Sequence, residues 1–255
     1  MDSCSVELEG VRAGVVANTA PTAEALRRAL AGLAVGDPDA PRNFSVLFSR
    51  DRRKAHLLYW GGCVAARSFD PDRILRSLCD HLGAHLPPPP GLVWIASLAY
   101  VRDGRAVLVP QPLKDDLRIV DRQLRSAGYV ALDSPRSLLD PTTGELVAIN
   151  LVQPDPEALR AAAEGVVRRR VEPAVPYGRY PVDRWVFIDY TGRWGPLSRA
   201  DATRAAALQI LGGIEHPDEA LLAALAELFG ATGASAMFPG YSDAPFDAVV
   251  GRGPR

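Results

Sequence analysis

The stretch from Val93 to Tyr129 reads VWIASLAYVRDGRAVLVPQPLKDDLRIVDRQLRSAGY, and it decides the fold. It contains two short apolar runs, 93–101 and 106–109. Asp103-Gly104 lies between them, and an Asp-Gly step favours a tight hairpin turn. The stretch therefore predicts two antiparallel strands joined by a turn.

The residues after the second run predict a loop over 110–116 and a helix over 117–127. Apolar residues recur every three or four positions in this helix, at Leu117, Val120, Leu124 and Ala127. Gly128 stands where a C-cap glycine is typical. A strand, a loop and a helix in this order form the layout of a phosphate-binding loop. In that motif backbone N–H groups and a lysine hold the phosphates, and a Ser or Thr hydroxyl holds Mg²⁺.

Helices and strands are expected both before and after this stretch. Before it, the spacing of apolar residues predicts helices over 21–33 and 70–82, and a hairpin of strands 44–48 and 56–60 that turns again into 63–65. After it, we expect a strand over 129–132, a hairpin over 138–147, a helix over 157–169, a strand over 185–190, and helices over 201–211 and 217–229. The segment 236–250 has no clear period. The fold class is α/β, or α+β in a looser classification, with a central mixed sheet flanked by helices.

Four consecutive prolines, Pro87 to Pro90, followed by Gly91, predict a rigid, extended linker. The chain then divides into an N-terminal hairpin-plus-helix subdomain over 1–86, a linker over 87–91 and a larger core over 92–255. A polyproline run can also be a ligand for aromatic-lined grooves, but this one lacks flanking basic residues.

Composition limits the class of function. The chain has 255 residues, of which 47% are hydrophobic, enough for a sizeable core. Its 29 basic and 30 acidic residues leave a net charge of −1, which argues against a dedicated nucleic-acid binder. Lys54 and Lys114 are the only lysines, so the basic class is almost entirely arginine. A GC-rich genome explains this bias, yet chemistry that needs a lysine has only two places to occur.

The chain shows no signal peptide and no apolar run near the ~20 residues that a membrane helix needs. We expect a cytoplasmic protein that uses neither membrane nor metal. Cys4, Cys63 and Cys79 are odd in number and widely separated, which favours free thiols over disulfides. His81 and His85 are spaced like zinc ligands on a helix, but no HExxH pattern or acid cluster accompanies them, so a solvated helix end is the preferred interpretation.

Around the loop, the sequence resembles the C-terminal catalytic domain of HPr kinase/phosphorylase and its small bacterial relatives. Asp103-Gly104 matches that family's hairpin turn, Arg125 to Tyr129 its helix end, and Asp140 to Glu145 (DPTTGE) a hairpin that often follows. The segment 180–187 is similar to the family's return strand. About fifty residues carry motifs, and the rest of the chain resembles these relatives only weakly.

The family's functional residues are absent at the matching positions. Its phosphate loop, G-x-S-G-x-G-K-S, is replaced by a remodelled loop, Gln111-Pro112-Leu113-Lys114-Asp115-Asp116-Leu117-Arg118. Leu117 falls on the lysine and Arg118 on the magnesium-binding hydroxyl. The family's histidine falls on Ala96, and its paired aspartates fall on Ser134-Pro135. The resemblance therefore implies a kinase-like fold without catalytic residues, which is a pseudokinase.

The new loop residues also oppose phosphate binding physically. Pro112 removes a backbone donor, and Asp115 and Asp116 place negative charge where a triphosphate would lie. Each close pair of like charges costs about 4 kcal/mol at an intermediate dielectric. Two alternatives stay open: Lys114 could reach a phosphate from a rearranged loop, and the two aspartates could bind Mg²⁺. Two acids are, however, also the ordinary complement of a helix N-terminus.

The first hypothesis for function is a non-enzymatic, cofactor-free protein that binds a peptide or acts as a scaffold in a peptide natural-product (RiPP) pathway. Its expected partners are a precursor or leader peptide and a modifying enzyme, because small relatives of this type resemble proteins found beside peptide-modifying enzymes. A sheet edge can hold such a peptide by strand addition. Arginines at 52, 53 and 168–170 could steer an acidic leader.

The second hypothesis is a peptide or protein phosphotransferase that uses ATP and magnesium through an atypical loop. The candidate ligand contacts are Lys114, Asp115, Arg118, Asp133 and Trp194. Trp194 lies in the distinctive loop 191–196, where it would cover a pocket or simply be part of a structural loop. A different enzyme finds no support, because the sequence shows no Ser-His-Asp arrangement, metal cluster or cofactor loop.

Overall fold

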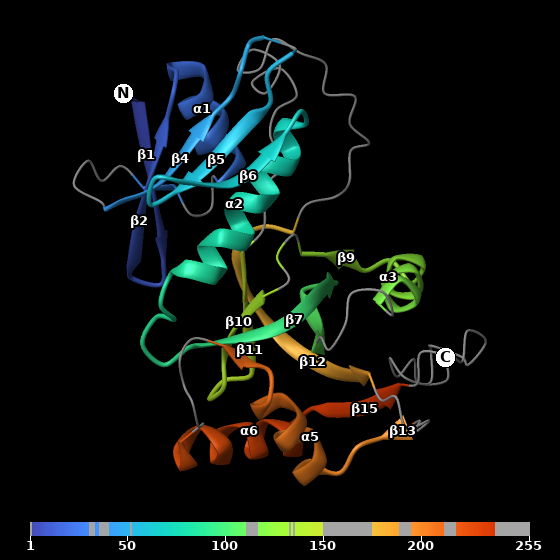
Figure 1. Cartoon of the computed structure of the whole chain (residues 1–255). Helices are drawn as coiled ribbons and strands as arrows, with labels where there is room; N and C mark the ends of the chain where they lie inside the picture. The colour runs from blue at the N-terminus through green and yellow to red at the C-terminus, as the bar shows by residue number, and fades with distance from the viewer. Residues whose placement is uncertain are drawn as a thin grey trace. The chain divides into compact units, whose positions relative to one another are not determined.

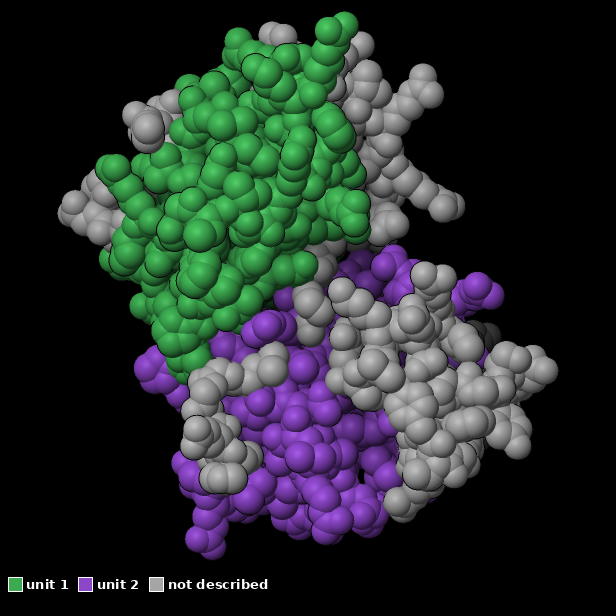
Figure 2. Space-filling model, in the orientation of Figure 1, with its two compact units in different colours: residues 1–89, 149–178 green, residues 90–148, 179–255 purple. Residues whose placement is uncertain are grey.

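The computed structural model describes residues 2–30, 34–35, 41–51, 53–110, 117–132, 134, 136–149, 175–188, 195–211 and 218–237. The chain forms two compact units: unit 1 comprises residues 1–89 and 149–178, and unit 2 comprises residues 90–148 and 179–255 (Figure 2). Each unit has its own β-sheet with helices, so the expectation of a mixed α and β protein is confirmed. The helix expected over 157–169 lies outside the described residues.

Unit 1 is a six-stranded sheet with strand order β3-β1-β2-β4-β5-β6 (Figure 1). Its strands are β1 (Asp2–Leu8), β2 (Val11–Ala17), β3 (Ala34–Val35), β4 (Arg42–Leu47), β5 (His56–Trp60) and β6 (Cys63–Ser68), and its helices are α1 (Ala20–Ala29) and α2 (Pro71–His85). The expected hairpin of β4 and β5 and the helix expected over 70–82 are confirmed, whereas the helix expected over 21–33 is present but ends at Ala29, with Leu30 as its C-cap. Strands β1 and β2 form a hairpin that the sequence analysis did not predict.

The helices of unit 1 begin where capping side chains stand. The Thr19 hydroxyl accepts a hydrogen bond from Thr22 N–H at the start of α1, and the Asp70 carboxylate accepts one from Asp72 N–H at the start of α2. Each helix also has a proline in its first turn, where the missing N–H costs nothing. Fully buried side chains from the strands and from both helices form the core: Phe44, Val46, Leu58, Leu26, Leu30, Ile74, Leu75 and Leu78.

Unit 2 has a nine-stranded mixed sheet with the main order β11-β10-β7-β8-β12-β15-β13, and β9 and β14 also pair with β7. Its strands are β7 (Val93–Arg102), β8 (Arg105–Pro110), β9 (Val130–Ala131), β10 (Arg136–Asp140), β11 (Glu145–Ala148), β12 (Gly178–Ile188), β13 (Gly195–Pro196), β14 (Ile210–Leu211) and β15 (Gly233–Met237). Its helices are α3 (Leu117–Ser126), α5 (Arg199–Ala207) and α6 (Glu219–Ala231).

Helices cover both faces of the sheet in unit 2 (Figure 1). Val186 of β12 packs in a buried cluster with Val120 and Leu124 of α3. Trp185, the neighbouring residue in the strand, points to the opposite face and packs against Phe229 of α6, with ring centroids 5.0 Å apart. Strand β12 is therefore central, and its two faces fix α3 and α6 on opposite sides.

Both hairpins predicted in unit 2 are confirmed. Strands β7 and β8 are antiparallel, and their turn has positive φ at Asp103 and Gly104, as a type I′ turn requires. In the β10–β11 hairpin, Asp140 Oδ1 accepts hydrogen bonds from Thr142 N–H and Thr143 N–H, and its other oxygen accepts one from Arg179. Burial acts to raise the pKa of Asp140, but these hydrogen bonds outweigh it and hold the pKa below its usual value.

The helix predicted over 201–211 is wrong at its C-terminal end. Helix α5 ends at Ala207, and residues Ile210 and Leu211 form β14, which pairs with Ile95 and Trp94 of β7. Ile210 and Leu211 are apolar because they pair with β7, and by chance they also fit the helical spacing of the residues before them. Among the described residues, no helix combines the length and the apolar character that crossing a bilayer requires.

Candidate functional site

The strand and helix that flank the predicted phosphate-loop region are both present. Strand β8 ends at Pro110, and α3 begins at Leu117, as the sequence indicated. Gln111, Pro112, Leu113, Lys114, Asp115 and Asp116 lie outside the described residues. Leu117 and Arg118 are the first two residues of α3, and only their backbone is described. Leu117, which the predicted resemblance places on the kinase lysine, is thus the first residue of the helix.

Helix α3 is held against the β7–β8 hairpin by polar contacts as well as by the buried cluster. The Tyr100 hydroxyl donates to Asp121 Oδ1 over 3.1 Å, and burial followed by the nearby Asp121 charge raises the pKa of Tyr100 far above its usual value. Arg102 donates to the Ala127 carbonyl oxygen over 2.7 Å, and its guanidinium lies 4.4 Å from the centre of the Tyr129 ring. These contacts, one in the middle of α3 and one just after its C-terminal end, hold the helix against the hairpin.

Three neighbouring strands of unit 2, β8, β12 and β15, run parallel to one another. Their register brings the carboxyl ends, at Pro110, Ile188 and Met237, to one edge of the sheet. Ligands of open α/β sheets bind at the carboxyl ends of parallel strands. Adjacent strands lie about 4.8 Å apart, so the last residues of β8 and β12, which precede the segments that contain Lys114 and Trp194, are neighbours.

Asp133 follows a strand that reaches the same edge. Strand β9 runs antiparallel to β7 and therefore parallel to β8, on the other side of β7. Leu132 N–H donates to the Ala99 carbonyl oxygen, and Ala99 pairs with Leu108, so the chain just before Asp133 is level with Leu108, two residues before the end of β8. Asp133 and Trp194 themselves lie outside the described residues. The topology thus brings the starting points of all the predicted ligand-contacting segments to one edge.

Two buried polar groups lie on the sheet near this edge without a hydrogen-bond partner among the described residues. They are the Ser97 hydroxyl and the Trp185 indole N–H. Ser97 stands opposite Pro110, at the point where the chain leaves β8. Most buried polar groups in proteins are hydrogen-bonded, so both groups have bonding capacity left for a further polar atom.

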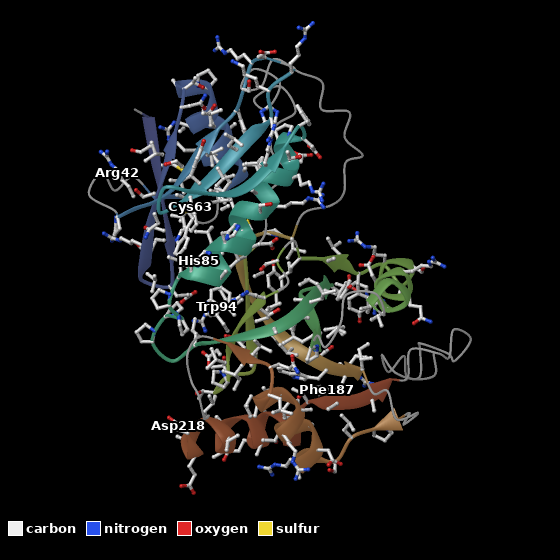
Figure 3. The ribbon with its side chains drawn as sticks, in the orientation of Figure 1. Arg42, Cys63, His85, Trp94, Phe187 and Asp218 are labelled. Carbon is white, nitrogen blue, oxygen red and sulfur yellow. The ribbon has the colours of Figure 1, made fainter. Side chains whose placement is uncertain are left out.

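The described histidines include a stacked pair, and all three cysteines are described. His85, which Figure 3 labels on α2, stacks on Trp60 with ring centroids 3.8 Å apart. Its Nε2 lies 3.1 Å from His81 Nδ1. In the ranges that the structure describes, no three His, Cys, Asp or Glu side chains come together as metal ligands. The three cysteines are free thiols; Cys63 is exposed and the other two are buried.

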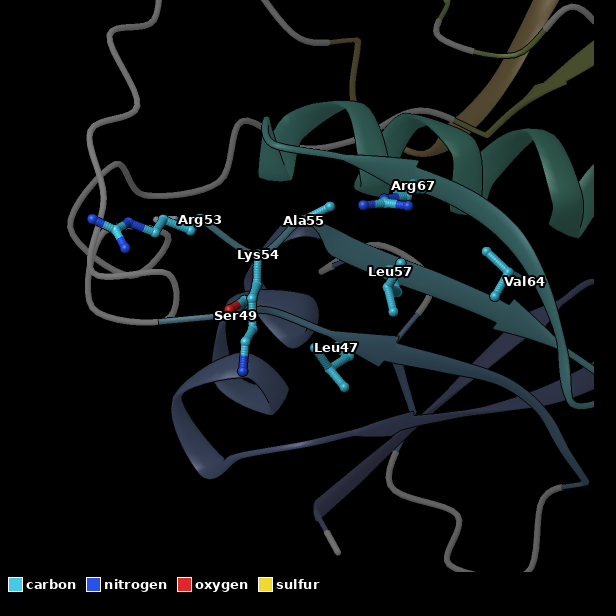
Figure 4. A pocket seen from close by; sticks show the side chains of 8 residues that line it. All are labelled: Leu47, Ser49, Arg53, Lys54, Ala55, Leu57, Val64 and Arg67. Atoms are coloured by element: carbon cyan, nitrogen blue, oxygen red, sulfur yellow. The ribbon is translucent and has the colours of Figure 1, made fainter. Parts of the chain in front are cut away.

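Unit 1 contains a pocket of about 550 Å³ that the sequence analysis did not predict (Figure 4). The cations that line it are Arg53, Lys54 and Arg67, and the apolar side chains are Leu47, Leu57 and Val64. Leu47 pairs with Leu57, and Leu57 pairs with Arg67, so these three form one row across β4, β5 and β6 on the same face of the sheet. Arg53 is the only one of these residues that the sequence had suggested as a partner contact; Arg52 and residues 168–170 lie outside the described ranges.

The turn that carries Arg53 and Lys54 is fixed by local hydrogen bonds. Asp51 Oδ1 accepts from Arg53 N–H over 2.9 Å, and the Asp51 carbonyl oxygen accepts from Lys54 N–H over 2.9 Å. His56 Nδ1 accepts from Ser49 N–H over 3.0 Å. Burial lowers the pKa of His56, although the charge of Asp70 opposes the shift, and the neutral ring keeps this nitrogen free to accept.

The chain matches no protein-family model, and no curated protein is significantly similar to it.

Proposed function

We propose that this chain is a catalytically inactive HPr-kinase-like protein that binds a peptide, or acts as a scaffold for a modifying enzyme, in a bacterial peptide natural-product pathway. The observation that carries the proposal is the segment between β8 and α3. A strand and a helix of the right type flank it, yet it contains no glycine, and Leu117 and Arg118 begin the helix. A phosphate loop needs converging backbone N–H groups and a lysine at this helix start.

Binding without catalysis is consistent with the charges in this segment. Asp115 and Asp116 directly precede the first helix residue in the sequence, and acids at such a position are the ordinary complement of the positive end of the helix dipole. What remains for function is recognition by surfaces and sheet edges, and a sheet edge can bind an extended peptide through backbone hydrogen bonds. The step from this fold to a peptide pathway is made by analogy with the small relatives that the sequence resembles.

A second candidate is a phosphotransferase that uses ATP and Mg²⁺ through an atypical loop. One of only two lysines in the chain, Lys114, lies in the segment between β8 and α3, and this favours the candidate. Asp115 and Asp116 offer the oxygen ligands that Mg²⁺ prefers.

Isothermal titration with MgATP separates the two candidates. We expect no saturable heat for the wild-type chain up to about 1 mM nucleotide, a limit that corresponds to about 4 kcal/mol of binding free energy. Micromolar binding that Lys114→Ala abolishes would overturn the proposal in favour of the phosphotransferase. Arg122→Ala is the matched control, because Arg122 is an exposed cation on α3 and lies after the loop.

Peptide binding is tested with the precursor peptide encoded nearest to the gene of this protein. The tagged full-length chain should retain this peptide in a pull-down and bind it with a Kd of tens of micromolar or tighter, as fluorescence anisotropy measures. A scrambled peptide of the same composition is the control. No binding of the precursor at about 100 µM, or equal binding of the scrambled peptide, would contradict the proposal.

A further inference from the structure

The pocket in unit 1 is a cationic hollow beside the edge of a β-sheet. We infer that it binds an acidic segment of a peptide, which extends the sheet by pairing with β6; this assignment rests on the proposed peptide-binding function and gives it a location and a chemistry. Leu47, Leu57 and Val64 supply the apolar lining, and Arg53, Lys54 and Arg67 supply the charge (Figure 4).

The charge of the pocket has one sign. Among the described residues, no acidic side chain lines it. Within the described ranges no ion pair engages the side chains of Arg53, Lys54 or Arg67, and all three are exposed. The nearest acid on the same turn, Asp51, accepts the backbone N–H of Arg53. Three cations that line one hollow, with no acid among its described lining residues, attract a partner with several carboxylates.

Strand β6 offers a place for a backbone to pair. It is the last strand in the order of its sheet, and no described strand pairs with its outer edge. Its residues are exposed or half-exposed along its whole length, and Val64 is 56% exposed. An unpaired strand edge is a template for another extended chain. Arg67 lies on this strand, so a chain paired with β6 passes directly beside the cationic pocket.

The dimensions favour a short extended segment over a folded partner. Strand β6 has six residues and therefore spans about 20 Å. A pocket of about 550 Å³ is in the range that holds a few side chains. The apolar lining from Leu47 and Leu57 lies between the hairpin turn and Arg67, so the segment should combine acidic residues with one or two aliphatic side chains.

A fluorescein-labelled synthetic peptide of about ten residues, in which glutamate alternates with valine or leucine, is the probe for this site. Fluorescence anisotropy should show binding to the full-length chain that weakens about tenfold in Lys54→Glu and in Arg67→Glu, and that weakens as NaCl rises. Arg204→Glu is the matched control: it is an exposed arginine on α5 in unit 2 and should leave the affinity unchanged. Circular dichroism of each variant checks that the chain is folded.

Two further peptides test the chemistry. The peptide with glutamine in place of glutamate should bind at least tenfold more weakly, and the peptide with alternate amide nitrogens methylated should lose binding, because it cannot pair with β6. Equal affinity for the glutamine or methylated peptide, or unchanged affinity in both Lys54→Glu and Arg67→Glu, would overturn the inference.

Failure of this inference can be distinguished from failure of the proposed function. If the wild-type chain and the double variant Lys54→Glu/Arg67→Glu bind the precursor peptide equally well, the pocket assignment is wrong and the proposed function stands. If the wild-type chain binds the acidic probe through these two cations but not the precursor peptide, the pocket assignment stands and the pathway is wrong.

Discussion

Gly144, in the DPTTGE hairpin, is the position where one added methyl group should cost the most. Its φ is +73°, and a Cβ at this position would lie 2.5 Å from Leu228 Cδ1 of α6. Leu228 is 8% exposed, so it has little room to move. Gly104, in the β7–β8 turn, has nearly the same φ of +75°, but a Cβ there would meet no atom within 4 Å. Alanine substitutions at the two glycines therefore separate the free-energy cost of backbone strain from that of steric overlap.

The expected costs follow from these two terms. A left-handed conformation costs a residue with a Cβ about 1 kcal/mol, so Gly104→Ala should lower the free energy of unfolding by about that amount. Gly144→Ala carries the same strain and also forces Leu228 out of its rotamer or shifts α6, which adds about 1–2 kcal/mol. Leu228→Ala removes the obstructing atoms. In that background, Gly144→Ala should again cost only about 1 kcal/mol, so the double-mutant cycle should show a coupling of about 1–2 kcal/mol.

Urea unfolding followed by tryptophan fluorescence measures these differences. Trp60 is the only tryptophan of unit 1, so a Trp60→Phe background makes the signal report unit 2 alone. This matters because two units need not unfold in one step. If Gly144→Ala costs no more than Gly104→Ala, or if the cycle shows no coupling, α6 does not pack on this hairpin. The contact between Gly144 and Leu228 would then contribute nothing to the stability of unit 2.

Two further predictions address the anchor of α3 and the thiols. Tyr100→Phe removes a hydrogen bond to Asp121 and should lower the free energy of unfolding by about 1 kcal/mol at pH 7. Because the pKa of Tyr100 is raised in the folded state, the stability of the wild-type chain should also fall as the pH rises above 10. Urea titrations at each pH should show that the Phe variant lacks this part of the decline. Cys63 should be the only thiol that reacts quickly with an aromatic disulfide reagent in the folded chain. Cys4 and Cys79 are buried, and burial raises the pKa of Cys4 to about 11. Fast reaction of all three thiols without denaturant would contradict the structure.

Local signals predicted the hairpins and helices where turn chemistry and apolar spacing agree. Asp103-Gly104 is an example, because its two positive φ angles are what an Asp-Gly turn predicts. Residues 210–211 show the limit. Their spacing continues the apolar stripe of α5, but pairing with β7 competes with the helix and prevails. Leu208, the C-cap residue of α5, is 77% exposed.

Strands whose pairing is non-local were the hardest to predict. Strand β15 has the sequence GASAM, which lacks the branched and aromatic residues typical of strands, yet it pairs in parallel with β12. Its small side chains, with Ala234 and Ala236 buried, suit a place beside the large Trp185 and Phe187 of β12. Such a strand is defined by its neighbour, so no pattern within GASAM could predict it.

The pocket in unit 1 was missed for the same reason. The sequence shows Lys54 as one charge in a turn and Arg67 as one residue of a strand, thirteen positions apart. The strand register, which pairs Leu47 with Leu57 and Leu57 with Arg67, is what brings Arg67 near the turn that carries Lys54. The two leucines line the space between Arg67 and the turn. The scarcity of lysine then becomes useful, because the two lysines lie in different units, and each belongs to one hypothesis. If Lys54 determines acidic-peptide affinity and Lys114 has no effect on nucleotide binding, the lysine that matters is the one that the kinase resemblance did not identify.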